Sequence, residues 1–274
     1  EPLVPFIDVV LLGDGEELLN HLINSLKSSK DLSRSNRLVQ LANIPGIYIP
    51  NFYQPKYDAS GTLLAVKPTK DNVPQSITKQ TWNGNKLSHS TIITPDAAWP
   101  NIHMVEVVRS CPELCRFCLA SYLTLPFRSP SVKEGLIPAA EIGLKVTKRL
   151  GLLGASVTQH PEFLEFLDWI NKDEFEDIRL SISSVRAATI NSQMTKILHR
   201  RGCKSLTMAI ESGSERIRKV INKKLSEEEI YSAVKYAFEG GMKNLKFYGI
   251  VGLPTEKEED ILSTESLLMD LKKK

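Results

Sequence analysis

The sequence lacks the features that mark several large classes of protein. No apolar run approaches the roughly 20 residues that a membrane-spanning helix needs, and no stretch resembles a signal peptide. The net charge of +3 over 274 residues is mild and does not by itself demand a nucleic-acid partner. Cysteine is scarce, and three of the four cysteines are clustered, which argues against a disulfide scaffold and favours a reducing compartment. We therefore expect a cytoplasmic globular protein with no membrane association.

The cysteine cluster is the strongest chemical signal in the chain. Cys111, Cys115 and Cys118 form a C-x3-C-x2-C motif directly after the apolar, β-prone run at 104–110. Three thiolates on one short loop can converge on one metal centre, whereas a closed zinc site and a common cubane iron–sulfur cluster each use four protein ligands. The fourth cysteine, Cys203, is distant in sequence. A cubane held by three cysteines leaves one iron free to bind a substrate or cofactor.

Strand and helix patterns alternate after this motif. Further strands are expected at 151–157, 178–183, 205–210 and 245–251, and helices at 161–170, 192–201, after Ser226 and after Thr255. Ser226 with Glu229, and Thr255 with Glu258, have capping-box spacing. A helix opened by Pro138 should bury Ile142, Val146 and Leu150 on one face. This alternation predicts a parallel sheet with right-handed crossovers, in which polar residues at the strand ends meet at one edge.

The spacing C-x3-C-x-Φ-C, with Phe117 as the aromatic residue, followed by βα units, resembles the radical S-adenosylmethionine (SAM) superfamily over residues 104–274. The resemblance implies an α/β fold with a partial parallel (β/α)6-type, TIM-like barrel. It also implies an enzyme with a [4Fe-4S] cluster on Cys111, Cys115 and Cys118, whose open iron chelates the amino and carboxylate groups of SAM. Reductive cleavage of SAM would generate a 5′-deoxyadenosyl radical, with ferredoxin or flavodoxin as the electron donor.

The same resemblance assigns cofactor contacts to the ends of the predicted strands. Gly154 and Ser156 stand where the family often has a G-G-E-type motif, and Ser156 replaces its carboxylate. Glu211 in an E-S-G-S stretch would bond ribose hydroxyls, and Gly252 with Pro254 matches a G-x-I-x-G-x-P element in which Tyr248 replaces the first glycine. Arg186, in the segment Ser183-Ser184-Val185-Arg186, could bind the carboxylate of SAM or could be a surface charge. The implied cofactor-binding residues are Phe117, Gly154, Ser156, Ser183, Arg186, Glu211, Gly213, Gly252 and Pro254.

The N-terminal part divides into two segments. Residues 1–30 read as strand, turn and helix, and resemble the C-terminal remnant of a doubly wound cobalamin-binding domain. The cobalt-ligating D-x-H-x-x-G motif is not in the chain, so cobalamin is expected only in the full-length protein. Residues 31–103 are expected to form a connector, with a short helix at 37–42 and strands at 62–66 and 90–94. The chain begins without methionine and ends in a helical pattern, so we expect a fragment that stops before the last barrel strand.

Two other functions stay open at this stage. A zinc module could combine the three cysteines with His103, His160 or Cys203, although His103 and His160 also suit structural roles and Cys203 a buried structural thiol. A catalytically inactive interaction module is the other alternative. The sequence does not identify the substrate. An RNA or a protein side chain suits the methylthiotransferase-like and elongator-like branch that the E-S-G-S stretch resembles.

Overall fold

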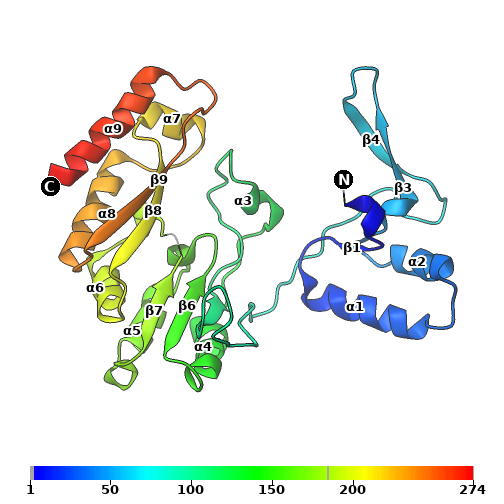
Figure 1. Ribbon diagram of the computed structural model, residues 1–274, viewed down its shortest axis with the longest axis horizontal. Coiled ribbons are helices and arrows are strands. Elements are labelled where there is room, and N and C mark those ends of the chain that lie inside the picture. Colours follow the sequence, from blue (N-terminus) through cyan, green and yellow to red (C-terminus); the bar gives the residue numbers. More distant parts are fainter. Residues whose placement is uncertain (1–2, 184, 274) are drawn as a thin grey trace. The chain divides into compact units, whose positions relative to one another are not determined.

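The computed structural model describes residues 3–183 and 185–273. These residues form two compact units, Glu1–Asn83 and Gly84–Lys274 (Figure 1). Among the described residues, no helix is both long enough and apolar enough to cross a membrane.

In the described part of the first unit, two helices and the short strand after them contribute buried residues to one small core, whereas the hairpin at 53–68 is largely exposed. Leu18, Leu41 and Ile47 are buried together in this core, so residues on both sides of position 30 share the same core. The expected helix at 37–42 lies within α2, and the expected strand at 62–66 overlaps β4. Strands β1 and β2 pair antiparallel, as do β3 and β4. The elements are β1 (Val10–Leu11), α1 (Gly15–Ser28), α2 (Arg34–Ala42), β2 (Ile47–Tyr48), β3 (Tyr53–Tyr57) and β4 (Leu63–Pro68).

The second unit is built on parallel strands that follow one another in chain order. Strands β5, β6 and β7 form one parallel sheet, and β8 pairs in parallel with β9. A bridge between Val185 and Met208 links the two sheets, and the Val185 amide donates to Thr207 O at 2.9 Å. The predicted α/β partial barrel is confirmed. The strands are β5 (His103–Glu106), β6 (Arg149–Leu153), β7 (Arg179–Ile182), β8 (Ser205–Glu211) and β9 (Asn244–Gly249).

Helices connect these strands, and α8 and α9 lie beside the β8–β9 pair (Figure 1). Ser226 and Glu229 form the predicted capping box at the start of α8, and Gly202 follows α6 with a φ of +88°, which favours glycine. The helices are α3 (Leu119–Leu123), α4 (Ile137–Leu144), α5 (Phe163–Ile170), α6 (Ser192–Arg200), α7 (Glu215–Val220), α8 (Glu227–Glu239) and α9 (Glu258–Lys273).

The two faces of the strands carry different side chains. Leu150, Leu152, Leu206 and Met208 are buried in the main core, together with helix residues such as Phe166. Because side chains alternate along a strand, the residues between them point to the opposite face. On β6, β7 and β8 these positions include the small residues Gly151, Ser181, Thr207 and Ala209, whereas their neighbours in register on β5 and β9 include Met104, Lys246 and Tyr248. A Cβ at Gly151 would overlap the Met104 sulfur on the neighbouring strand. Gly151 therefore leaves room for the Met104 side chain on the inner face of the partial barrel.

Three local predictions are wrong. Helix α4 ends at Leu144, and Leu150 belongs to β6. Ile142 and Val146 are 50% and 73% exposed. The buried face of α4 instead consists of small residues such as Ala140 and Gly143. Thr255 lies outside α9 with a φ of +67°, and Asp260 instead accepts a hydrogen bond from the Lys257 amide near the start of that helix. Residues 90–94 form no strand; an isolated bridge pairs His89 with Val105.

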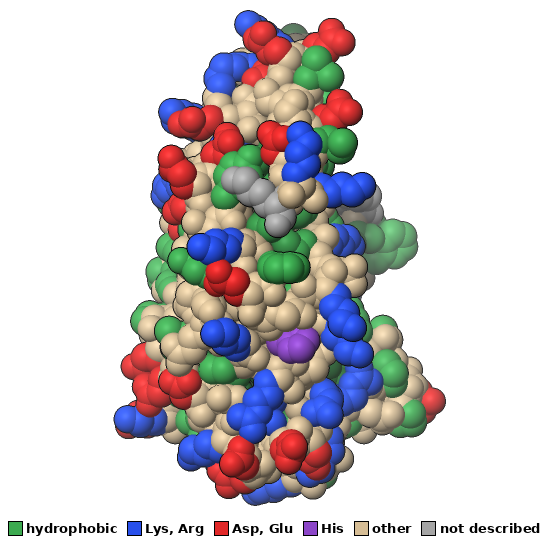
Figure 2. Space-filling model, turned by 90° about the vertical axis from the view of Figure 1, so that its left-hand side faces the viewer, with side chains coloured by type: hydrophobic (Ala, Val, Ile, Leu, Met, Phe, Trp, Pro, Cys, Tyr) green, Lys and Arg blue, Asp and Glu red, His purple; other side chains and the backbone are tan. Residues whose placement is uncertain are grey.

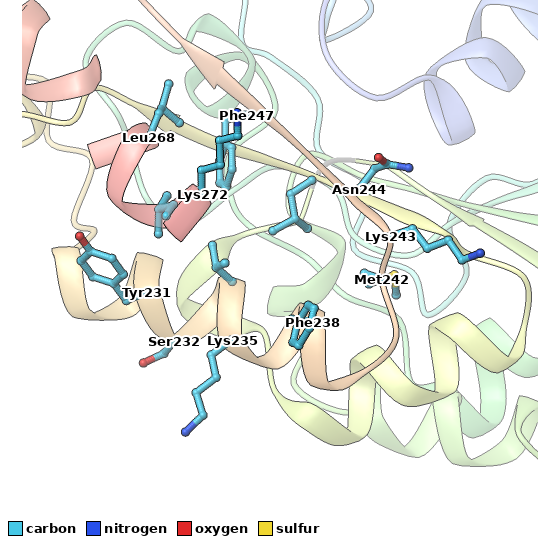
Figure 3. Close-up of a pocket in the computed structure, with 13 residues that line it drawn as sticks. Tyr231, Ser232, Lys235, Phe238, Met242, Lys243, Asn244, Phe247, Leu268 and Lys272 are labelled. Carbon is cyan, nitrogen blue, oxygen red and sulfur yellow. The ribbon is translucent and has the colours of Figure 1, made fainter. Parts of the chain in front are cut away.

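A groove between α8, β9 and α9 has a volume of about 1060 Å³ (Figure 3). Its walls are apolar, with Phe238, Phe247 and Leu268 among the lining residues, and Lys235, Lys243 and Lys272 stand at its rim. Phe238 is exposed there. The groove shares no lining residue with the cavity at the cysteines described below.

Gly143→Ala is expected to destabilise the second unit by about 2 kcal/mol, although alanine is the better helix former. A Cβ at Gly143 would overlap the buried ring of His103 on β5, so the added methyl group must displace the ring or the helix. Chemical denaturation measures the effect. Ile142→Ala, at an exposed position of the same helix, should change the free energy of unfolding by less than about 0.5 kcal/mol. Equal effects of the two substitutions would contradict the packing argument.

Candidate active site

The three cysteines of the motif lie on the loop between β5 and α3 and open into one cavity of about 190 Å³. Residues from the ends of β6, β7 and β8 line the same cavity, as the parallel-sheet argument predicts. All three thiols are free. The other lining residues are Glu113, Phe117, Ser121, Ala155, Ser156, Val185, Arg186, Ala187, Ala209, Glu211, Lys223 and Leu225.

Cys115 is the buried member of the three. Burial raises the pKa of its thiol, and the neighbouring thiols of Cys111 and Cys118 raise it further. The cations of Lys223 and Arg186 act in the opposite direction and lower it. Iron binds the thiolate rather than the thiol, so these two cations favour the form of Cys115 that a cluster requires.

A distant segment of the chain holds the cysteine loop in place. Leu114, between Cys111 and Cys115, has a φ of +53°, and its carbonyl accepts hydrogen bonds from Asn222 Nδ2 at 2.9 Å and the Tyr122 hydroxyl at 3.0 Å. The Arg116 amide donates to Ile221 O at 2.9 Å. Asn222 and Ile221 belong to the loop after α7, so that loop fixes the backbone on which the thiols stand.

Glu113 connects the cysteine loop to three other loops. Its carboxylate accepts a hydrogen bond from Gln159 Nε2 at 2.6 Å. It also pairs with Arg186 at 3.4 Å and Lys224 at 3.8 Å. The Glu113 and Arg186 side chains are each only 14% exposed, so this ion pair is shielded more than an ordinary surface pair. Arg186 therefore lines the cavity, and the alternative of a surface charge is wrong.

A second ion pair crosses the cavity at the end of β8. Glu211 is the last residue of that strand, with a φ of +67°, and its carboxylate lies 3.0 Å from Lys223 Nζ. Both side chains are nearly buried. Sequence reasoning found Glu211 but missed Lys223, as it missed Glu113 and Gln159. Glu113 lies within the cysteine motif, but the partners that give it a role are distant in sequence, and no sequence signal links Gln159 or Lys223 to the cysteines.

Of the predicted residues after β6 and β7, Ser156 and Arg186 line the cavity, whereas Gly154 and Ser183 are not among its lining residues. Ser156 is buried, lines the cavity and donates its hydroxyl to Gln159 Oε1. Gly154 lies against Val108, where an added Cβ would come within 2.7 Å of Val108 Cγ2, and its carbonyl accepts a hydrogen bond from the Ser183 hydroxyl at 3.2 Å. Ser184 lies outside the described residues. Phe117 lines the cavity and is partly exposed.

The three remaining predicted residues stand apart from this cavity. Gly213 donates its amide to Thr264 Oγ1 at 2.8 Å, and a Cβ there would overlap the backbone of α9. Gly252 has a φ of +86° and donates its amide to the Glu256 carboxylate at 2.6 Å. Pro254 lies in the turn before α9. The packing of α9 and a turn account for these residues, and cofactor contacts by them stay a prediction.

The residues that could complete a zinc site have other partners. His103 is buried and donates Nε2–H to Ala139 O, while His160 pairs Nε2 with Pro130 O and accepts the Glu162 amide at Nδ1. The Cys203 thiol donates to Leu180 O at 3.1 Å, and burial raises its pKa to about 11. None of the three lines the cysteine cavity. His160 and Cys203 therefore have the structural roles that the sequence also allowed.

The donor set fits a cubane cluster. Within residues 3–183 and 185–273, no group of three or more His, Cys, Asp or Glu side chains is gathered for a single metal ion. In a cubane, each thiolate binds a different iron, so the three ligands stand farther apart than those of one ion. Three free thiols around one cavity, with cations nearby, suit such a group. If the site held only a zinc ion, the polar residues at the strand ends that line the same cavity would have no role in binding it.

Known families match most of the chain. Residues 105–268 match the radical SAM superfamily, and residues 1–50 match the N-terminal region of radical SAM proteins. An uncharacterized protein of Methanocaldococcus jannaschii is 35% identical over 180 residues, which cover 65% of this chain and 39% of that protein. A tRNA-2-methylthio-N(6)-dimethylallyladenosine synthase of Alkaliphilus oremlandii is 28% identical over 181 residues, covering 61% of this chain and 37% of the enzyme.

A solved structure has the same fold over nearly the whole chain. It is the radical SAM methyltransferase TsrM from Kitasatospora setae, with cobalamin and a [4Fe-4S] cluster bound. The TM-score is 0.69 at 14% sequence identity, and the match covers 98% of this chain and 52% of TsrM. The chain thus spans less than half of the two curated relatives and about half of this structure.

Proposed function

Because the chain belongs to the radical SAM superfamily, whose members are enzymes that use a [4Fe-4S] cluster and SAM, we propose that it carries a site that reductively cleaves SAM. Cys111, Cys115 and Cys118 would hold the cluster. One observation supports this most: the three thiols share a single cavity with polar residues from three strand ends. When bound, the cluster and SAM supply a 5′-deoxyadenosyl radical that abstracts hydrogen from a substrate.

The charged residues of the cavity have complementary roles in this proposal. Arg186 presents a guanidinium group suited to the carboxylate of SAM, and Glu113 orients it from the cysteine loop. Glu211 would accept hydrogen bonds from ribose hydroxyls while Lys223 balances its charge. Phe117, Ser156, Gly154 and Ser183 would complete the wall around the cofactor. These side chains bind and orient, and the chemistry belongs to the cofactor.

The substrate is proposed as a class only. The similarity to an enzyme named for tRNA modification supports an RNA, and a protein side chain is the other class that the sequence suggested. On the face shown in Figure 2, basic and acidic side chains are interspersed, which gives RNA binding no added support there. A ferredoxin or flavodoxin would supply the electron, and the free thiols suit the cytoplasm. Cobalamin, which TsrM binds, is proposed only for the full-length protein.

Anaerobic reconstitution tests the proposal directly. The chain is incubated with iron and sulfide, reduced with dithionite and supplied with SAM, and 5′-deoxyadenosine is quantified. Iron–sulfur absorbance together with 5′-deoxyadenosine formation is the expected result. A cluster without cleavage of SAM contradicts the proposed activity. Stoichiometric zinc with no cluster would favour the zinc-binding alternative.

Glu211→Ala is expected to weaken SAM binding to the reconstituted protein roughly tenfold, since it removes a charged hydrogen-bond acceptor and leaves Lys223 unpaired in the cavity. Anaerobic titration calorimetry measures the dissociation constant. Glu215→Ala is the matched control, because this carboxylate is exposed and pairs only with its helical neighbour Lys219 among the described ion pairs. If Glu211→Ala binds SAM as tightly as the control, Glu211 does not contact the cofactor.

A further inference from the structure

A serine hydroxyl lies against the sulfur of one of the three cysteines. Ser121, on the short helix α3, donates its hydroxyl to Cys118 Sγ over 3.5 Å. The side chain lines the cysteine cavity, and the residue is only 1% exposed. Bulk water therefore competes little for this hydroxyl, and a hydrogen bond in a shielded site is electrostatically stronger than one at the surface.

The backbone around Ser121 is fixed from the other end of the loop. Ser110, which precedes Cys111, donates its hydroxyl to Ser121 O at 3.0 Å. Ser110 is itself buried and has a φ of +72°. The two serines thus join the segment before the first cysteine to the segment after the last one. The Ser121 hydroxyl is held beside Cys118 rather than left to rotate into solvent.

The surroundings of the other two sulfurs differ from this one. Cys111 lies 3.8 Å from Gln159 Oε1, a carbonyl oxygen that can accept a hydrogen bond but cannot donate one to a thiolate. Around Cys115 the main described influences are burial and the charges of Lys223 and Arg186. Among the described contacts of the three sulfurs, the one at Cys118 is therefore a neutral hydroxyl donor, and it comes from a serine that is itself buried.

We propose that Ser121 is a positioning residue that raises the reduction potential of the cluster through its hydrogen bond to Cys118. This inference rests on the proposed function, because it requires a cluster on the three cysteines. Reduction adds negative charge, which spreads onto the coordinating sulfurs. A donor at one of those sulfurs stabilises the reduced state more than the oxidised state, and hydrogen bonds to sulfur are among the factors that set cluster potentials.

Ser121→Ala is expected to lower the equilibrium constant for one-electron reduction about fivefold, the effect of a single net hydrogen bond. At 59 mV per tenfold change, this is a midpoint potential about 40 mV more negative. A redox titration followed by electron paramagnetic resonance measures it. Thr124→Val is the matched control: Thr124 directly follows α3, and its hydroxyl donates to Ala120 O rather than to a sulfur. The potential of Thr124→Val should equal that of the unmodified protein. Ser121→Thr keeps a hydroxyl, so its potential should lie close to that of the unmodified protein.

A second measurement starts from the unmodified protein and detects the proposed hydrogen bond directly. Electron–nuclear double resonance on the reduced unmodified protein should show an exchangeable proton coupled to the cluster that disappears in deuterated buffer. This coupling should persist in Thr124→Val and be absent from Ser121→Ala. Equal potentials in Ser121→Ala and the control, or no such proton in the unmodified protein, would overturn the inference while leaving the cluster assignment intact. Failure of the unmodified protein to assemble a cluster would instead refute the proposed function.

Discussion

Replacing Cys111, Cys115 and Cys118 together with alanine is expected to abolish the iron–sulfur absorbance of the reconstituted chain and to reduce 5′-deoxyadenosine to the assay background. The three thiols line one cavity, and within the described residues His103, His160 and Cys203, the candidates for replacement ligands, have partners elsewhere. A cubane bound by only three cysteines has no protein ligand left when all three are replaced. Iron and sulfide analysis, the visible spectrum and the 5′-deoxyadenosine assay measure the result.

Cys203→Ala is the matched control for this experiment. Cys203 lies in the main core, its thiol donates to Leu180 O, and burial raises its pKa to about 11, so it is protonated and inert at neutral pH. The variant should keep full cluster content and activity, apart from a modest loss of stability. Retention of the complete spectrum by the triple variant, or its loss in Cys203→Ala with the fold intact, would refute the ligand assignment.

Arg218→Met is expected to lower the free energy of unfolding of the second unit by about 3 kcal/mol. The Arg218 side chain is buried, and its guanidinium donates to Ser212 O and Gly213 O at 2.9 Å and to Leu225 O at 2.8 Å. Methionine fills similar space but leaves these buried carbonyls without their donor. Burial lowers the pKa of Arg218, yet an arginine side chain stays charged at any ordinary pH.

Arg218 also ties the E-S-G-S stretch to the start of the segment that leads into α8. Its loss should therefore loosen Glu211 and Lys223 and weaken SAM binding as a secondary effect. Chemical denaturation measures the stability change. Arg200→Met is the control, since Arg200 is exposed and pairs with Asp173 at the surface, and its removal should cost less than about 1 kcal/mol. A similar small cost for Arg218→Met would show that water replaces its hydrogen bonds.

The sequence was sufficient where a signal is local. The cysteine spacing, the β-prone runs and the capping box at Ser226 depend on residues a few positions apart, and the strands and α8 form close to where these patterns place them. Glu211 and Arg186 could be found because the ends of parallel strands meet at one edge of a sheet. That rule needs only the strand boundaries.

The missed residues depend on contacts that no local pattern encodes. Glu113, Gln159 and Lys223 act through partners that lie on other loops, and a charged residue in a loop is ordinarily solvated. The wrong prediction for α4 has a different cause. Its buried face consists of small residues that admit the His103 ring, whereas the periodicity argument looked for large apolar ones and found Ile142 and Val146.

The contacts of Asn222 have a consequence for protein synthesis. Asn222 holds the backbone of Glu113, which lies 109 residues earlier in the chain. At the usual 5–20 residues per second, a ribosome needs roughly 5–20 seconds to add that interval. For most of it, once Cys118 has been added, the three thiols are already in the nascent chain, but the segment that shapes their loop has not yet been synthesised. Iron and sulfide delivered during translation would therefore reach cysteines whose loop is not yet ordered, and stable cluster insertion is expected only after Asn222 has left the ribosome.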